Sequence, residues 1–472
     1  MKTLRRCTPI VLNVGQHELY SSSLGHVSVA QPKHSSIPDH SASSLSNDET
    51  FVPSKINYSR FINKLSSKRS ASLLREICSK LDHLPPTCIK FAIGVPNVLT
   101  FPFKKVSVEL ITGESIELQG EELSIALQYL PSQGYRPLIN ILQKLQDSFH
   151  GPQNWENRAI MVTSGTQDAL SKAVDMLMSF NDPVLLPDPI YSGAIDLFKP
   201  YDVEIITMKQ DSSGIIVEDV KKVLMERKEK MQSIPKVIYL NPIASNPGGT
   251  TLTTNRKREI YQLACEYNML ILEDDPYYYL NFGQKNPVSL MSMDIEGRVL
   301  RFDSFSKIMS SGLRVGFVTG PKMLVRQMEL HMQTSSINAS SLSQMLLYKL
   351  LSKWGIDGFT SHTMQVKKFY QQKRDHTMQA VEKELKGLAE WYEPTGGMFL
   401  WLKIIGLNDT KPLVTSRCLK KLVVLAPGYA FATNYTNSSP YVRISYSIAT
   451  QEEIDRGISL LAESIREELK LI

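Results

Sequence analysis

The chain has 472 residues, more than one compact core holds, so two domains are expected. Its 42% hydrophobic and 21% charged residues are ordinary for a soluble globular protein, and no run approaches the 18 apolar residues of a membrane span. The net charge of +6 is mild and no dense Lys/Arg block occurs, so neither nucleic acid nor a membrane is predicted as a partner.

Residues 1–50 have no helix or strand period, and a lysine and two arginines precede the first acid, Glu18. The apolar run 9–14 is too short for a secretory signal, whereas a basic, Ser-rich start is typical of a mitochondrial transit peptide. A disordered tail without an address is the alternative, because three acids follow later in the segment. We therefore predict the mitochondrial matrix, with the cytoplasm as the alternative.

The cysteines are odd in number and form no C-x-x-C pair, so they signal neither a zinc site nor a disulfide framework. A reducing compartment suits them. They are Cys7, Cys78, Cys88, Cys265 and Cys418.

From residue 51 onward short apolar, β-branched runs alternate with helical stretches. This alternation predicts an α/β fold with a mostly parallel seven-stranded sheet flanked by helices. Ligands of such sheets bind beyond the carboxyl ends of the strands. The expected strands are 159–162, 184–186, 203–207, 237–240, 270–272, 299–302 and 315–319.

We divide the globular part into a large domain over 106–341 and a smaller α+β domain over 342–472. The second contains long helices and two expected strands, 396–402 and 440–445. The segment 51–105 is expected to form an N-terminal arm and part of the small domain. No internal repeats occur.

The first candidate site follows the expected strand 159–162. The residues after it, 163–170, contain small hydroxyl side chains and a glycine before a helix, and free amides at a helix N-terminus bind anions. Thr166 and Gln167 would donate to a phosphate. A plain helix cap at Ser164 or Thr166 is the alternative.

Two further strand ends carry polar or aromatic residues. Tyr191 is placed to stack on a flat heteroaromatic ring, with ordinary tyrosine packing as the alternative. Asn246 lies in a Pro- and Gly-rich turn after 237–240 and is placed to bind a ligand oxygen, with turn chemistry alone as the alternative.

Consecutive acids follow 270–272, and acids after a buried strand are unfavourable unless they are paired. Asp275 would form an ion pair with a protonated ring nitrogen, and Tyr278 would share a ring hydroxyl with Asn246. Asp274 is interpreted as a solvated loop acid, and a loop of solvated acids is the alternative for the whole group.

Lys307 is the most informative residue. It follows Ser304 and Ser306, and Arg314 comes seven residues later. An amine that forms a Schiff base needs a dry, cationic neighbourhood, and a phosphate is held by hydroxyls and a guanidinium. A surface lysine is the default for Lys307 alone, but the ordered set of residues at strand ends predicts a pyridoxal phosphate site.

Here the chain resembles fold-type I pyridoxal-phosphate-dependent aminotransferases of class I/II, and within them the kynurenine/α-aminoadipate group. The resemblance covers about residues 55–470 and is most specific at the lysine segment. It is carried by 57–62, 101–104, 126–129, 163–165, 275–278, 303–307, 396–401 and 439–443.

The resemblance implies residue roles. Lys307 would bind the cofactor and shuttle the proton, Asp275 would pair with the pyridine nitrogen, and Tyr191 would stack on the ring. Asn246 and Tyr278 would contact the ring oxygen. The phosphate would be held by Thr166, Gln167, Ser304, Ser306 and Arg314, and the substrate would be bound by Arg443, Asn246, Arg75 and Gly94. Tyr129 would reach the neighbouring subunit's site in a homodimer.

Three positions depart from the family pattern. The turn before Asn246 lacks its usual asparagines, Gly248 replaces a threonine, and Ile93 replaces a glycine beside Gly94, which would reshape the substrate pocket.

We expect an aminotransferase that moves the amino group of L-2-aminoadipate, L-kynurenine or an aromatic amino acid to 2-oxoglutarate by a ping-pong mechanism. The alternatives are a pyridoxal phosphate lyase or decarboxylase of the same fold, and a cofactor-sensing regulator. The regulator is disfavoured because residues 1–50 are too short for a DNA-reading domain.

Overall fold

The computed structural model describes residues 56–73, 76, 87, 89, 91 and 94–470. The predictions for residues 1–50, Arg75 and Ile93 lie outside them. Within the described part of the chain, no helix is long and apolar enough to cross a membrane.

All seven expected runs of the large domain form strands of one sheet. A two-residue strand, β6 (Gly214–Ile215), extends it at one edge, so the described residues form eight strands in the order β3-β10-β9-β8-β7-β4-β5-β6. The pairs β9–β8, β8–β7, β7–β4 and β4–β5 are parallel, while β10 runs antiparallel to both its neighbours. The strands are β3 (Arg158–Thr163), β4 (Pro183–Asp188), β5 (Glu204–Asp211), β7 (Val237–Leu240), β8 (Leu270–Asp274), β9 (Val299–Ser304) and β10 (Gly316–Pro321). The predicted α/β fold is confirmed.

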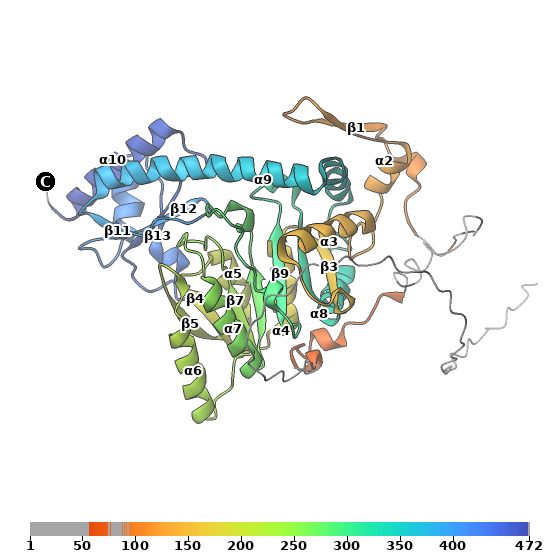
Figure 1. The fold of residues 1–472 in the computed structure, drawn as a ribbon, viewed down its shortest axis with the longest axis horizontal. Helices are drawn as coiled ribbons and strands as arrows, with labels where there is room; N and C mark the ends of the chain where they lie inside the picture. The colour runs from red at the N-terminus through yellow and green to blue at the C-terminus, as the bar shows by residue number, and fades with distance from the viewer. Residues whose placement is uncertain are drawn as a thin grey trace, which may run out of the picture. The chain divides into compact units, whose positions relative to one another are not determined.

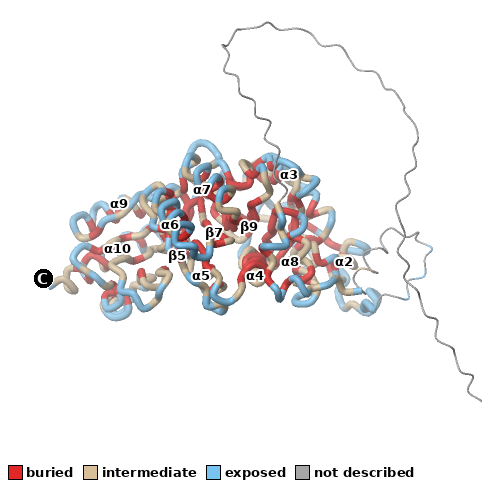
Figure 2. The backbone as a smooth tube through the Cα atoms, turned by 90° about the horizontal axis from the view of Figure 1, so that it is seen from below, coloured by how far each residue is buried: buried red, intermediate tan, exposed pale blue. Residues whose placement is uncertain are grey.

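Both faces of this sheet are buried, as a mostly parallel sheet requires. Alternate residues of one strand enter different cores: Leu270 and Leu272 of β8 lie in one apolar cluster and Ile271 in another. Helices flank the sheet (Figures 1 and 2): α3 (Arg136–His150), α4 (Thr166–Leu177), α5 (Ser192–Phe198), α6 (Val217–Glu229), α7 (Thr254–Glu266) and α8 (Lys322–Thr334).

A second, antiparallel sheet follows in the last third of the chain, and both strands predicted there are present. Its order is β11-β12-β14-β13. The strands are β11 (Ala389–Trp391), β12 (Phe399–Ile404), β13 (Ala426–Pro427) and β14 (Tyr441–Ser445), followed by α10 (Gln451–Glu468).

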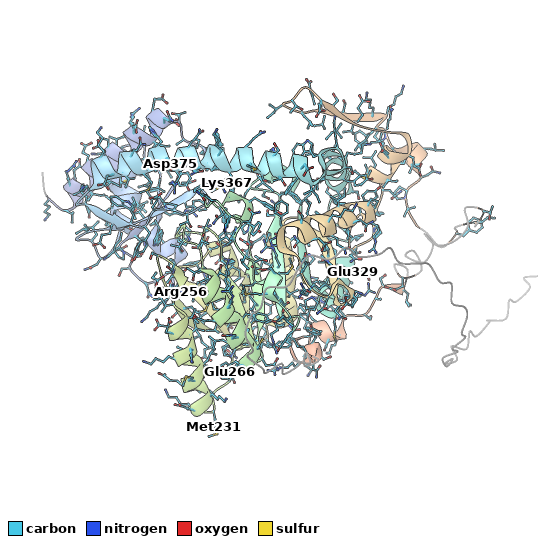
Figure 3. The ribbon with its side chains drawn as sticks, in the orientation of Figure 1. Met231, Arg256, Glu266, Glu329, Lys367 and Asp375 are labelled. Atoms are coloured by element: carbon cyan, nitrogen blue, oxygen red, sulfur yellow. The ribbon has the colours of Figure 1, made fainter. Side chains whose placement is uncertain are left out.

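The helix α9 (Ser341–Leu385) joins these two parts, since it contacts both α3 and α10 (Figure 1). Its backbone leaves helical geometry at Gly355, with φ 59° and ψ −165°. Lys367 and Asp375, labelled in Figure 3, lie in the part that follows this break.

Part of the expected N-terminal arm packs against the large sheet's helices. Asn63 donates from its side-chain amide to the carbonyls of Asp175 and Met178 around the end of α4. Phe61 is fully buried in the cluster that α4, α5 and α8 share. A hairpin, β1 (Lys105–Glu109) and β2 (Ser115–Gln119), and α2 (Gly120–Ala126) follow.

Candidate active site

A cavity of about 340 Å³ lies at the carboxyl ends of the central strands. Nine of the residues predicted from the sequence line it: Thr166, Gln167, Tyr191, Asn246, Ser304, Ser306, Lys307, Arg314 and Arg443. Seven residues that we had not predicted also line it: Leu170, Asn241, Asp274, Pro276, Tyr277, Ser311 and Phe399.

Lys307 follows β9 and is largely enclosed. Burial lowers the pKa of its amine, and the positive charges of Arg314 and Arg443 lower it further, while Asp274 opposes them. At a given pH, a larger fraction of this amine is therefore neutral than on a surface lysine. A nucleophilic or basic lysine needs this neutral form.

A set of small donors gathers at the N-terminus of α4. The helix begins after Gly165, which has φ 84° and no side-chain capping bond, so the alternative of a plain cap at Ser164 or Thr166 does not apply. A Cβ on Gly165 would lie 2.5 Å from Nη2 of Arg314, whose guanidinium donates to the carbonyl of Ser164 at 3.1 Å. Only glycine lets the arginine approach the helix start, and a guanidinium beside free amides suits a phosphate.

The side chain of Gln167 differs from the others in this group. Its amide donates to the carbonyl of Gly193 at 2.6 Å, so it ties α4 to the start of α5. Tyr191, the residue before α5, faces the cavity, and burial raises the pKa of its phenol.

The structure corrects the assignment of the acid. Asp275 is not a cavity residue: its carboxylate accepts from Nη1 of Arg301 at 2.9 Å, in a fully buried cluster that also holds Glu273 and Asp303. Asp274, which we had interpreted as a solvated acid, is 3% exposed and lines the cavity.

The reason is the alternation of strand residues. Side chains two apart share a face of the sheet. Asp274 continues the face of Leu270 and Leu272, and Asn241 and Ser304 end the same face of β7 and β9. Because every residue of β8 is buried, this alternation alone does not show from the sequence which of the two faces ends at the cavity.

The Asp274 carboxyl is held on one side only. Its Oδ2 accepts from the Tyr239 hydroxyl at 2.7 Å, whereas its Oδ1 is buried without a hydrogen-bond partner. The side-chain amide of Asn241 donates to the Asp274 carbonyl at 2.7 Å. Burial raises the pKa of Asp274 to about 7, although the Tyr239 hydrogen bond opposes the rise.

The tyrosine assignment also moves by one residue. Tyr278 donates from its hydroxyl to the Phe149 carbonyl at 3.1 Å and packs on His150, away from the cavity. Tyr277 lines the cavity instead. The acid and the tyrosine thus keep their spacing of three but begin one position earlier.

Asn246 and Arg443 meet across the cavity. The guanidinium of Arg443, on β14, donates to Oδ1 of Asn246 at 2.8 Å and lies 4.1 Å and 4.5 Å from the ring centroids of Phe399 and Phe431. The Asn246 backbone donates to Oδ1 of Asn241 at 2.7 Å, so the altered turn leaves Asn246 in place. Nε of Arg443 is buried without a partner and is available to a carboxylate.

Besides Asp275 and Tyr278, two further predicted residues do not line this cavity. Tyr129 is 52% exposed, and Gly94 is exposed with no atom within 4 Å of a built Cβ. Their predicted contacts with substrate and with a neighbouring subunit stay predictions.

The model of the family "Aminotransferase class I and II" matches residues 86–461 of this chain. The chain belongs to this family. It is 40% identical to the mitochondrial kynurenine/alpha-aminoadipate aminotransferases of Mus musculus and Bos taurus, over 88% of this chain and 100% of each relative. It is 33% identical to aminotransferase tdiD of Emericella nidulans, over 80% of this chain and 89% of that relative.

Solved aminotransferases have the same fold. Aro8 from Candida albicans superposes with a TM-score of 0.79 at 24% identity, covering 89% of this chain and 100% of that one. The Pyrococcus horikoshii kynurenine aminotransferase superposes with a TM-score of 0.70 at 29% identity, over 88% and 98%. The protein is therefore an aminotransferase, as the sequence predicted.

Proposed function

We propose that this aminotransferase uses pyridoxal 5'-phosphate to move the amino group of L-2-aminoadipate, L-kynurenine or an aromatic amino acid to 2-oxoglutarate. The support for the substrate class is the 40% identity, over nearly the whole chain, to relatives named for kynurenine and α-aminoadipate. The same names, with the basic N-terminal segment, support a mitochondrial location. We retain the division into large and small domains, and the homodimer, as parts of the proposal.

The cavity fits this cofactor. Pyridoxal phosphate has a basic ring nitrogen, a phosphate and an aldehyde, and each finds a complement here. The unpartnered Oδ1 of Asp274 suits a protonated nitrogen, the donors around Arg314 and the start of α4 suit the phosphate, and Lys307 suits the aldehyde. Asp274 and Tyr277 take the roles first expected of Asp275 and Tyr278.

Each polar side chain then has a task. Arg443 binds the substrate α-carboxylate with the face that Asn246 leaves free, and the two phenyl rings fix the plane of its guanidinium. Lys307 Nζ, with its lowered pKa, accepts and returns a proton at the bound amino acid. When bound, the cofactor supplies the electron-withdrawing ring and takes up the amino group.

The single observation that carries the proposal is the convergence of Lys307, Asp274 and Arg443 on one cavity. The test is an absorbance spectrum of the purified protein with pyridoxal phosphate, before and after L-2-aminoadipate or L-kynurenine. We expect a cofactor band that shifts with the donor and returns with 2-oxoglutarate. A cofactor band that does not change with these donors would overturn the proposed substrate class. Absence of any bound chromophore would overturn pyridoxal phosphate as the cofactor.

Replacing Lys307 tests the role of its amine. Lys307→Ala should lower transamination by at least about 10²–10⁴-fold, the range for loss of a proton-transferring group. Glutamate formation from 2-oxoglutarate is the measurement, and Lys386→Ala, at an exposed lysine paired with Glu382, is the control. Full activity of Lys307→Ala would refute the mechanism.

A further inference from the structure

The two carboxylate oxygens of Asp274 have different surroundings. Oδ2 accepts a hydrogen bond from the Tyr239 hydroxyl at 2.7 Å, and Oδ1 is buried with no partner. Asp274 lines the cavity, so the oxygen that remains is the one available to a ligand there. A carboxylate tied at one oxygen keeps one orientation, which a catalytic group needs.

Tyr239 is built to hold that orientation. It lies on β7, is fully buried, and packs edge-on against Phe198 at 6.5 Å between ring centroids. Burial raises the pKa of its phenol well above the ordinary value, and the negative charge of Asp274 adds to the rise. The hydroxyl therefore stays protonated at neutral pH and acts as the donor in this pair.

The other charged groups around Asp274 act in both directions. Asp275 on the same chain segment and Asp303 on β9 raise its pKa, as burial does, while Arg301 on β9 lowers it. Tyr191, Tyr277, Lys307 and Arg443 face it from the cavity side. Among the described residues, Tyr239 supplies the side-chain hydrogen bond that favours the ionised form.

We propose that Tyr239 is a positioning residue of the transamination reaction: its hydroxyl holds the Asp274 carboxylate with Oδ1 turned to the cavity, where it meets the cofactor's ring nitrogen. The proposal rests on the proposed function, because it assigns Tyr239 to the same cofactor. Loss of the hydroxyl removes both the orientation and a force that keeps the carboxylate charged.

The test uses Tyr239→Phe, which removes one oxygen and keeps the ring. Pyridoxamine phosphate is the probe, because it lacks the aldehyde and so does not depend on attachment to Lys307. Its dissociation constant for cofactor-free protein is measured by fluorescence from pH 6 to 9. We expect about tenfold weaker binding at pH 7, the scale of one hydrogen bond to a charged group.

The pH dependence gives a second readout. Binding to a charged Asp274 weakens as the pH falls and the carboxylate takes up a proton. Because Tyr239→Phe raises the pKa of Asp274, the weakening should begin at a pH about one unit higher than in the wild type. A purely structural role for Tyr239 would lower the affinity for the probe at every pH without changing the pH at which binding begins to weaken.

Two further variants separate the explanations. In an Asp274→Asn background, Tyr239→Phe should have almost no additional effect, because both changes remove the same interaction. Tyr261→Phe is the matched control: Tyr261 also donates from a buried hydroxyl to a carboxylate, that of Asp294 at 3.1 Å, but lies outside the cavity. It should leave probe binding unchanged even if the melting temperature falls.

The outcomes distinguish this inference from the proposed function. If the wild type and Tyr239→Phe bind pyridoxamine phosphate equally well, and their binding weakens at the same pH, Tyr239 has no positioning role and the proposed function stands. If the wild type does not bind the probe at any pH, the proposed function fails. The positioning role is also overturned if Tyr239→Phe weakens probe binding equally in the wild-type and Asp274→Asn backgrounds.

Discussion

Asp274 and Asp275 are adjacent carboxylates with opposite surroundings. Each has one buried oxygen without a hydrogen-bond partner, but Asp274 lines the cavity, while Asp275 is paired with Arg301 in a cluster whose side chains are at most 5% exposed. One acid is thus left ready for a ligand, and the other stabilises the sheet behind it. The roles of the two acids can be distinguished by replacing each of them, in turn, with asparagine.

Asp274→Asn should reduce transamination by about 10²–10³-fold, because a neutral amide does not pair with a charged ring nitrogen. Asp275→Asn should retain more activity but lower the free energy of unfolding by roughly 3 kcal/mol, since it weakens a buried ion pair. Steady-state rates and urea titrations measure the two effects. The reverse pattern would return the catalytic role to Asp275.

Asp274 also affects stability without cofactor. Its pKa rises from an ordinary 3.8 to about 7 in the fold, so the unfolded chain ionises first and stability falls as the pH rises from about 4 to 7. Cofactor-free Asp274→Asn should therefore be more stable than the wild type at pH 8, by on the order of a few kcal/mol, with a smaller difference at pH 5.

Melting temperatures at the two pH values check this expectation. Asp357→Asn, at an exposed position on α9, is the control for replacing a carboxyl by an amide. A wild type that equals or exceeds Asp274→Asn in stability at pH 8 would show that the buried carboxyl is not destabilising.

At the scale of elements, three neighbouring strands end on one face with a cavity-lining residue each: Asn241 after β7, Asp274 on β8 and Ser304 on β9. Parallel pairing of β7 with β8 and of β8 with β9 brings these ends together. Asn241 then bridges the Asp274 carbonyl and the Asn246 amide, which ties the turn after β7 to the end of β8.

The break in α9 depends on one glycine. Gly355 has φ 59° and ψ −165°, a conformation that almost only glycine adopts, although a Cβ there would meet no atom within 4 Å. Gly355→Ala should therefore lower the free energy of unfolding by about 1–3 kcal/mol through backbone strain alone.

Gly457, within α10, is the matched control. A Cβ there also meets no atom within 4 Å, and its φ is not positive. Gly457→Ala should raise stability by about 0.5–1 kcal/mol, as expected of alanine in a helix. Chemical denaturation of the two variants gives the comparison. Equal shifts for both would show that the backbone at Gly355 is not strained.

At the scale of the whole molecule, the proposed homodimer has a complementation test. Neither Lys307→Ala nor Tyr129→Ala protein should be fully active, but a mixed dimer would combine Lys307 of one subunit with Tyr129 of the other in one intact site. Refolding equal amounts together should restore about a quarter of wild-type activity, because half the dimers of a symmetric pair are mixed. Activity no higher than the average of the parents would exclude a shared site.

The sequence by itself determined the chemistry and the fold class. Short continuous apolar runs and their spacing predicted all seven strands, because burial on both faces of a strand leaves a strong apolar signal. The lysine segment was found from its hydroxyls and arginine after a strand, and Asn246 from a turn at a strand end, whereas Arg443 came from the family resemblance.

Only the tertiary structure decided which of two adjacent acids and which of three consecutive tyrosines faces the cavity. A shift of one residue along a strand turns a side chain to the opposite face, and the local composition of Glu273–Tyr279 is nearly the same for either register. It also decided that Tyr239 and Asn241 hold Asp274, because these contacts join strands far apart in the chain. Residues act together here through the pairing of strands, which a linear pattern does not specify.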